Sequence, residues 1–254
     1  MKIGIVIPAR LESERLPNKV LLNFLDKPMI EHVWRRSQMI KNKVDTVIAT
    51  DSNEIARLCE SFKARTLMTS SKHINGLSRV GEVAKRLNWD FYLILQADEI
   101  LIEPESLDQL IKSIKMKPQI NFFNLVTNLS NFSELMDPNI VKCLIREDRS
   151  IMHIFRISGM VSPPEIQMEY TQKICGVYAI SKNALMKITN TPIQKIEKSE
   201  SIEQMKIIEL GLDIFGVQVD RNYPSVNTAA DALQVLNILQ NEAKQKEFLN
   251  FWNK

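Results

Sequence analysis

The sequence of 254 residues predicts an α/β fold with a mostly parallel, doubly wound sheet. Two observations carry this prediction. In the first half of the chain, short apolar runs alternate with segments of helical periodicity. These runs are continuously apolar rather than alternating, which is typical of strands that helices cover on both faces.

The elements of the first half follow one another in the order that this fold requires. Strands are expected at 2–8, 44–50, 64–69 and 91–96, and helices at 28–40, 52–62, 77–87 and 104–114. Ser52 or Asn53 is suited to cap the second helix, and Pro104 is suited to the first turn of the fourth.

The second half is less regular. Strands are expected at 120–129, 139–145, 175–181 and 212–219, helices at 202–210 and 228–245, and a loop with paired prolines at 162–170. In the last helix, an apolar stripe is expected to cover the sheet: Leu233, Leu236 and Leu239. No linker divides the chain, so we expect a single domain over 1–254 that includes a smaller α+β lobe at 130–195.

Composition excludes several classes of protein. A net charge of +3 is too small to indicate a nucleic-acid partner. The three widely separated cysteines favour a reducing compartment over a disulfide framework or a zinc site. No apolar run approaches the ~20 residues that cross a bilayer, and the chain starts without a signal-peptide pattern. The expectation is a cytoplasmic protein with no membrane and no nucleic-acid partner.

A basic loop follows the first strand. Residues 8–19, PARLESERLPNK, hold three regularly spaced cations: Arg10, Arg15 and Lys19. At the carboxyl end of a strand, such cations can converge on a polyanion, and arginine offers a planar fork to phosphate oxygens. The loop lacks the glycines of a P-loop or a dinucleotide fingerprint. The alternative is a solvated basic loop whose charge Glu12 and Glu14 offset.

An acidic pair follows the strand expected at 91–96. Asp98 and Glu99 fall at the carboxyl edge of the same sheet. A carboxylate there is suited to Mg²⁺, which prefers oxygen ligands and commonly shares them with substrate phosphates. An acidic pair alone is a weak signal, but together with the basic loop it indicates nucleotide chemistry.

These residues also carry a family resemblance. PARLESERLPNKVL and DKPMIEHVW resemble the opening of the 3-deoxy-manno-octulosonate cytidylyltransferases, or CMP-Kdo synthetases, which belong to the GT-A-like, Rossmann-like nucleotidyltransferases. The likeness continues through VIATDSNEI, TSSKHINGLSRVGEVA, LQADEILIEPESLDQLI, DPNIVK, GVYAI, ESIEQMKIIELG and VNTAADAL. It covers nearly the whole chain in family order.

The resemblance implies attack of a sugar hydroxyl on the α-phosphorus of CTP, with pyrophosphate leaving. Arg10, Arg15 and Lys19 would hold the triphosphate and act with Asp98, the magnesium ligand, in catalysis. The nucleotide would also contact the following positions: Pro8, Ala9, Ser70, Gly76, Arg79 and Gln96. No histidine-based triad is needed, and the three histidines are expected to be structural or at the surface.

The sequence departs from the family pattern at the metal-binding positions. Asn227 stands where the family has an aspartate, so an amide oxygen replaces a carboxylate as the second metal ligand. This change predicts weaker metal binding, unless Glu99 or the substrate completes the shell. Ala97 replaces a glycine that lets the backbone and the nucleotide approach closely.

The acceptor side departs further. Arg156 and Tyr178 fit positions that help to hold the acidic sugar, as do Glu203 and Gln204, but Ile174 replaces a histidine. Residues of these types also occur on solvated helix faces and half-buried strands, so structural roles remain open. The changed pocket predicts Kdo or a modified 2-keto-3-deoxy sugar acid as the acceptor.

The expected function is therefore a Mg²⁺-dependent cytidylyltransferase that serves surface polysaccharide, lipopolysaccharide or capsule synthesis. The family implies a homodimer, with the 130–195 lobe at the contact. Two alternatives remain open: a nucleotidyltransferase for another sugar or small polyol, and a catalytically silent homologue that binds nucleotide.

Overall fold

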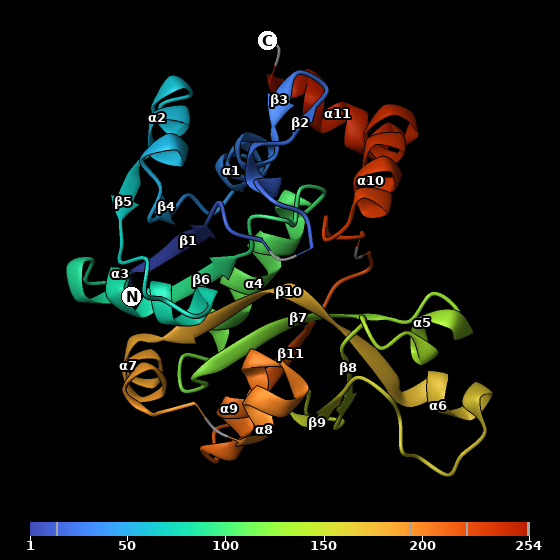
Figure 1. Ribbon diagram of the computed structural model, residues 1–254. Helices are drawn as coiled ribbons and strands as arrows, with labels where there is room; N and C mark the ends of the chain where they lie inside the picture. The colour runs from blue at the N-terminus through green and yellow to red at the C-terminus, as the bar shows by residue number, and fades with distance from the viewer. Residues whose placement is uncertain (14, 194, 222, 253–254) are drawn as a thin grey trace. The chain divides into compact units, whose positions relative to one another are not determined.

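The computed structural model describes residues 1–13, 15–193, 195–221 and 223–252. Figure 1 shows its helices and strands. The chain forms two compact units, Met1–Asp108 with Tyr223–Lys254, and Gln109–Asn222. The lobe predicted at 130–195 falls within the second unit. Glu14, which was considered as a counter-charge to the basic loop, lies outside the described residues.

The first unit contains a parallel run of four strands. Its order is β6 (Phe91–Leu95), β1 (Ile3–Ala9), β4 (Asp45–Thr50) and β5 (Thr66–Met68). Every residue of β1 and β6 is buried, as their continuous apolar sequences predict. The chain leaves β1 toward β4 and β5 and returns to β6 on the other side of β1. The carboxyl ends of β1 and β6 therefore form a topological switch point, where open α/β sheets bind their ligands.

Short helices and capped turns connect these strands. The elements are η1 (Lys19–Leu21), β2 (Asn23–Phe24), β3 (Lys27–Pro28), α1 (Met29–Gln38), α2 (Asn53–Ser61), α3 (Gly76–Arg86) and α4 (Pro104–Met116), which crosses the unit boundary. Ser52 caps α2 by accepting hydrogen bonds from the backbone N–H groups of Glu54 and Ile55. Asn75 and Ser78 form a capping box at the start of α3.

The C-terminal segment forms two helices rather than the single helix expected at 228–245. These are α10 (Ala229–Asn241) and α11 (Ala243–Trp252). Glu242, which lies between them, has an extended backbone that ends α10. The apolar stripe was only partly right: Leu239 is buried as predicted, but Leu236 is half-buried, Leu233 is 70% exposed, and Val235 is buried instead. The buried stripe follows an i, i+4 spacing that starts two residues later than expected.

A buried arginine fixes α11 on α1. The Nη2 of Arg36 donates to Oε1 of Gln245 at 2.6 Å, and its guanidinium lies over the rings of Phe248 and Trp252. Burial lowers the pKa of Arg36 to about 9, so it stays charged at neutral pH. Cation–π and hydrogen-bond contacts together offset part of the desolvation of this charge.

The second unit is a mixed sheet. β7 (Phe122–Asn128) pairs with β11 (Ile214–Gln218) in parallel and with β10 (Thr171–Ser181) antiparallel. β8 (Lys142–Ile145) then pairs antiparallel with both β10 and β9 (Ile151–Phe155). The helices are α5 (Phe132–Met136), α6 (Pro164–Tyr170), α7 (Lys182–Asn190), α8 (Lys195–Glu200) and α9 (Glu203–Glu209). The sequence had not indicated β9, α5, α7 or α8.

The prediction of a loop at 162–170 was wrong, because most of this segment forms the helix α6. The helix begins at Pro164, and a proline is compatible with the first turn, where its missing N–H has no partner to lose. The Nε2 of Gln167 donates to the carbonyl oxygens of Ser162 and Met160, which holds the preceding turn. The paired prolines therefore mark the start of a helix.

The α/β fold class with helices flanking a mostly parallel sheet is confirmed. α1 and α3 both contact β1 in the first unit. Among the described residues, no helix combines the length and the apolar character needed to cross a bilayer.

Candidate active site

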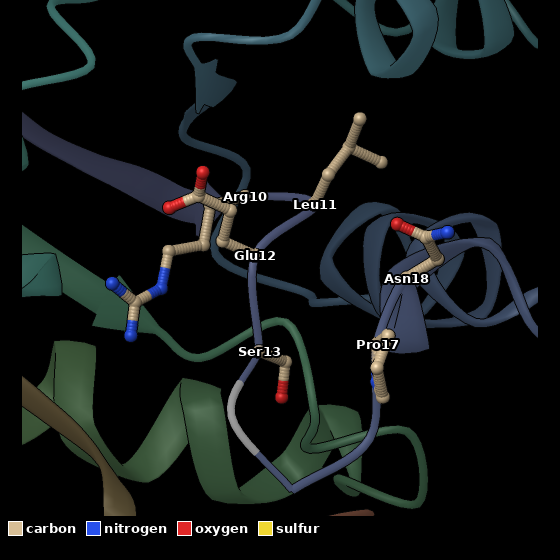
Figure 2. A pocket seen from close by; sticks show the side chains of 6 residues that line it. All are labelled: Arg10, Leu11, Glu12, Ser13, Pro17 and Asn18. Carbon is tan, nitrogen blue, oxygen red and sulfur yellow. The ribbon is translucent and has the colours of Figure 1, made fainter.

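The basic loop between β1 and η1 forms a depression of about 420 Å³. Figure 2 shows the side chains that line it, with Arg10 and Glu12 on one side of the loop and Leu11 on the other. The loop closes on itself because the N–H of Asn18 donates to the carbonyl oxygen of Leu11 at 3.1 Å. Asn18 has a φ of 55°, a left-handed conformation that asparagine tolerates better than most residues.

Lys19, at the start of η1, lies among three oxygen atoms. Its Nζ is 2.6 Å from Oδ2 of Asp98, 3.1 Å from the carbonyl oxygen of Val226 and 3.4 Å from Oδ1 of Asn227. The backbone N–H of Val226 donates to the carbonyl oxygen of Asp98 at 3.1 Å, which ties the segment before α10 to the end of β6. Segments that are distant in the sequence therefore meet around one ammonium group.

Arg15 joins the same cluster through Asn227. Its Nη2 donates to Oδ1 of Asn227 at 3.0 Å. Arg15, Lys19, Asp98 and Asn227 are therefore brought together as the sequence predicted, and we call these four residues the phosphate cluster. Arg10 lines the adjacent depression instead. With two cations and one carboxylate, the phosphate cluster carries a formal charge of about +1, which favours an anionic ligand.

The oxygen atoms of the phosphate cluster fit a hard cation. Lys19 Nζ already lies among a carboxylate, an amide and a backbone oxygen, the ligand types that Mg²⁺ accepts. Across the described ranges, however, no group of three His, Cys, Asp or Glu side chains could hold a metal. Glu99 is buried, and its Oε1 accepts a hydrogen bond from Ser225 at 2.8 Å. The set therefore suits a cation whose remaining ligands come from phosphate and water.

Three of the expected nucleotide positions also lie together. A Cβ at Gly76 would lie 3.3 Å from Nε2 of Gln96 and 3.3 Å from Cγ of Pro8. Glycine therefore lets the start of α3 approach the ends of β1 and β6 closely. Ala9 and Ala97, which follow Pro8 and Gln96, are both buried.

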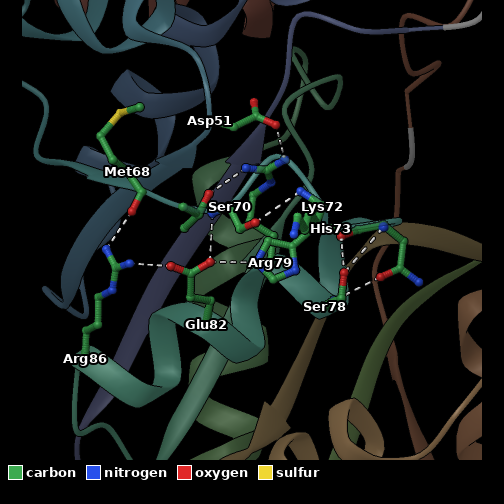
Figure 3. Close-up of polar contacts among 11 residues, drawn as sticks. Asp51, Met68, Ser70, Lys72, His73, Ser78, Arg79, Glu82 and Arg86 are labelled. Atoms are coloured by element: carbon green, nitrogen blue, oxygen red, sulfur yellow. Dashed lines mark hydrogen bonds and ion pairs between the residues drawn. The ribbon is translucent and has the colours of Figure 1, made fainter.

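Arg79 takes a structural position in the first unit. It is buried, and its guanidinium donates to Oδ2 of Asp51 at 2.9 Å and to Oγ1 of Thr69 at 2.5 Å (Figure 3). These contacts connect α3 to the carboxyl ends of β4 and β5. Arg79 therefore anchors Thr69 at the start of the loop of residues 69–75, between β5 and α3, whereas Ser70 is exposed on that loop.

Arg156 in the second unit is held by backbone carbonyl oxygens. Its Nε donates to Glu200 and its Nη2 to Ser201, at 2.9 and 3.1 Å. Its Nη1 donates to Pro138 and Asn139, at 2.9 and 3.5 Å. The guanidinium thus joins two loops of the second unit, a different contact from the sugar carboxylate that the resemblance implies.

The other predicted acceptor residues form side-chain pairs. The hydroxyl of Tyr178 donates to Oε2 of Glu203 at 2.8 Å, and burial raises the pKa of Tyr178 well above its usual value. The Nε2 of Gln204 donates to Oδ1 of Asn124 at 3.0 Å. Tyr178 and Gln204 are therefore each held by a side chain of the second unit, and their role as sugar contacts stays a prediction.

Several residues that contact the candidate site were not predicted from the sequence. Asp51 follows β4, so the rule that pointed to Asp98 at a strand end could also have pointed to Asp51. The carbonyl oxygen of Val226 left no sequence signal, because any residue supplies a carbonyl. Glu82 lies in the second turn of α3, where a charged side chain is usually solvent-exposed.

Comparisons with known proteins agree with this geometry. A sequence profile of the family described as "Cytidylyltransferase" matches residues 4–214. The 3-deoxy-manno-octulosonate cytidylyltransferase of Chlorobium limicola is 34% identical over 250 residues, which cover 96% of this chain and 99% of that protein. The enzyme of the same name from Escherichia coli is 30% identical over 95% of this chain and 97% of its own length.

Solved structures show the same relationship. A structure of CMP:2-keto-3-deoxy-manno-octonic acid synthetase complexed with CTP superposes with a TM-score of 0.89 at 29% identity, over 95% of this chain and 100% of that one. A putative glucose-1-phosphate thymidylyltransferase from Bacillus anthracis shares the fold, with a TM-score of 0.67, 14% identity, and coverage of 94% of this chain and 96% of that one. This chain is therefore a nucleotidyltransferase that belongs to the cytidylyltransferase family, as a divergent member of the 3-deoxy-manno-octulosonate cytidylyltransferases.

Proposed function

We propose that this protein transfers CMP from CTP to a 2-keto-3-deoxy sugar acid, Kdo or a modified relative, and releases pyrophosphate. The observation that carries the proposal is the meeting of Arg15, Lys19, Asp98 and Asn227 at the switch point of the sheet. The two relatives of at least 30% identity named above are 3-deoxy-manno-octulosonate cytidylyltransferases, and the similar CMP:2-keto-3-deoxy-manno-octonic acid synthetase was solved with CTP.

In this proposal the cations bind the triphosphate and neutralise the charge that develops on the leaving pyrophosphate. Arg15 and Lys19 approach from the loop after β1, and Arg10 extends the positive surface along the depression. When CTP binds, the ammonium group of Lys19 would break its ion pair with Asp98 and pair with a phosphate oxygen instead. Binding and orientation then supply most of the catalysis, because in-line displacement needs no covalent nucleophile.

Mg²⁺ is the cofactor that the proposal requires. Asp98 and Asn227 would hold it, with phosphate oxygens and water completing the shell. When bound, Mg²⁺ would polarise the phosphate and lower the pKa of the attacking hydroxyl. An amide at position 227 contributes less charge than a carboxylate, so we expect the nucleotide and the metal to bind together.

The acceptor is proposed to be acidic because of the likeness to Kdo cytidylyltransferases, since Arg156, the cation at a predicted sugar position, donates to backbone carbonyl oxygens. Tyr178, Glu203 and Gln204 would contribute polar groups to the acceptor site rather than positive charge. Ile174 in place of a histidine favours a modified acceptor over Kdo itself.

The cytoplasmic location and the homodimer stay predictions. Exposed apolar side chains on α5, β9 and α6 support a contact surface in the second unit, namely Phe132, Met136, Met152 and Ile166. The dimer can be checked by sedimentation of the purified protein.

The test is pyrophosphate release from CTP in the presence of Mg²⁺ and each of several 2-keto-3-deoxy sugar acids. We expect turnover with CTP and at least one acid, and little turnover with UTP, ATP or GTP. Release of pyrophosphate only with a neutral sugar or polyol would favour the alternative acceptor. Stabilisation by CTP without turnover of any acceptor would favour the silent homologue.

A further inference from the structure

The nucleotide loop between β5 and α3 has no helix or strand of its own. It covers residues 69–75 and leads into Gly76 at the start of α3. Ser70, one of the predicted nucleotide contacts, is exposed on this loop. A loop without regular hydrogen bonding keeps its shape only if side chains hold it.

One carboxylate, that of Glu82, holds the middle of this loop. Its Oε2 accepts hydrogen bonds from the backbone N–H of Ser70 at 2.8 Å and from Nε2 of His73 at 2.7 Å (Figure 3). Its Oε1 is paired with Nη2 of Arg86, one helical turn further along α3. Arg86 in turn donates from Nη1 to the carbonyl oxygen of Met68 at 2.5 Å, at the end of β5.

These contacts keep Glu82 ionised. Partial burial alone raises the pKa of this carboxyl, but hydrogen bonds from Ser70 and His73 and the charge of Arg86 lower it below its usual value. Charge-assisted hydrogen bonds of this kind are stronger than neutral ones. The negative charge therefore stabilises the positions of Ser70 and His73.

The remaining contacts of the loop are fewer. Arg79 anchors Thr69 at the start, and the capping box of Asn75 and Ser78 fixes the end. Within the loop, the N–H of Lys72 donates to Oγ of Ser70 at 3.2 Å. Glu82 is thus the contact between the middle of the loop and the body of the first unit, among the contacts the structure describes.

We propose that Glu82 is a positioning residue for nucleotide binding, which sets the shape of the 69–75 loop through Ser70 and His73. The inference rests on the proposed function, because that function makes this loop a CTP contact. Glu82 acts on affinity for the nucleotide, while the transfer step depends on the phosphate cluster. It also acts on selectivity for cytosine over uracil, because the loop adjoins Gly76 and Gln96.

The primary test compares Glu82→Gln with wild type by calorimetric titration of CTP and by steady-state kinetics. Glutamine keeps the shape of the side chain but removes the charge. We expect Kd and KM for CTP to rise about tenfold, and the preference for CTP over UTP to shrink, while kcat changes less than about threefold. Glu60→Gln, on the exposed face of α2, is the matched control and should leave every value unchanged.

A second variant separates loss of the loop contact from a general loss of stability. His73→Asn removes the loop side of the same contact and leaves α3 intact. If His73 acts through its contact with Glu82, the double variant should bind CTP about as weakly as Glu82→Gln alone, rather than with additive losses. Melting temperatures of all the variants report on stability separately.

The outcomes separate this inference from the function on which it rests. Wild-type CTP binding with unchanged Kd, KM and selectivity in both Glu82→Gln and His73→Asn would overturn the positioning role alone. A fall in melting temperature without a change in CTP affinity would likewise assign Glu82 to stability. Absence of CTP binding by the wild-type protein would overturn both proposals.

Discussion

The two units hold their polar side chains in different ways. In the first unit, Lys19 and Asp98 form an ion pair with partly exposed side chains, 16% and 21% exposed respectively. In the second unit, Arg156 is directed at four backbone carbonyl oxygens, and Tyr178 is buried against Glu203. The first arrangement joins the opposite charges of two partly buried side chains, and the second joins a cation to backbone oxygens and a phenol to a carboxylate.

This difference separates groups that can change partners from groups that are committed to the structure. A phosphate oxygen offers the ammonium group of Lys19 the same kind of charge-assisted contact as Asp98, so it can replace Asp98 beside Lys19. Carbonyl oxygens that accept from Arg156 would lose their partner if the arginine turned to a substrate. Two residues that match the family pattern can therefore make local contacts that point to different roles.

The largest effect is expected from Asp98→Asn. Removing the carboxylate deletes the charged ligand for Mg²⁺, so kcat should fall by roughly 10²–10³-fold or more, a loss typical of a missing electrostatic contact in the transition state. The measurement is the rate of pyrophosphate release at saturating CTP. Because Asp98 is partly exposed, the melting temperature should stay close to that of wild type. Asp45→Asn, at the exposed start of β4, is the control, and wild-type turnover in Asp98→Asn would contradict the metal assignment.

Lys19→Met should have the next largest effect. Losing one charge-assisted contact to phosphate should weaken CTP binding by about 10- to 100-fold, the equivalent of ~1.5–3 kcal/mol. Binding of Mn²⁺ without nucleotide should instead become tighter, because Asp98 no longer pairs with an ammonium group. Calorimetric titration with CTP and with Mn²⁺ measures the loss of the first affinity and the gain in the second. Lys85→Met on α3 is the control. Unchanged CTP affinity would show that the Lys19–Asp98 pair is purely structural.

Arg156→Lys tests whether the polar contacts of the second unit are structural. Lysine cannot reproduce the forked contacts with the carbonyl oxygens of Pro138, Glu200 and Ser201, so the free energy of unfolding should fall by about 1–2 kcal/mol. Chemical denaturation measures this change, and Arg146→Lys, whose guanidinium contacts the hydroxyl of Ser150, is the control. Unchanged stability with a large rise in KM for the sugar acid would make Arg156 an acceptor ligand, as the resemblance implies.

The smallest effect is expected from Asn227→Asp. A second carboxylate beside Asp98 should tighten Mn²⁺ binding by about tenfold, or ~1.4 kcal/mol. Arg15 and Lys19, which both donate to this side chain, should limit the gain by neutralising the new charge. Turnover should change little. If wild type is inactive and Asn227→Asp restores activity, the natural chain is the silent homologue.

Much of the first unit was predictable from the sequence because its signals are local and strong. The apolar runs at 2–8 and 91–96 are covered on both faces, and strand ends place Lys19 and Asp98 at the same edge. The family resemblance then identified Asn227 as a further residue of this site, although it lies more than 120 residues beyond Asp98 in the sequence. Its contact with Arg15 was not foreseeable, since it depends on how the loop folds back.

The second unit was less predictable because its contacts are long-range. The bonds from Arg156 depend on the positions of carbonyl groups near residues 138 and 200, which no side-chain pattern encodes. The helix at Pro164 was mistaken for a loop because prolines both break helices and start them. In the first unit, Leu233 was misjudged for a related reason, since a short apolar repeat fits two helix faces equally well.

The most direct test of the account is a crystal structure of the protein with CTP and Mg²⁺. We predict that Asp98 ligates the metal, that Asn227 contacts it directly or through water, and that Lys19 and Arg15 lie within hydrogen-bond distance of phosphate oxygens. A complex in which the nucleotide binds elsewhere, with the Lys19–Asp98 contact unchanged, would contradict the proposed site.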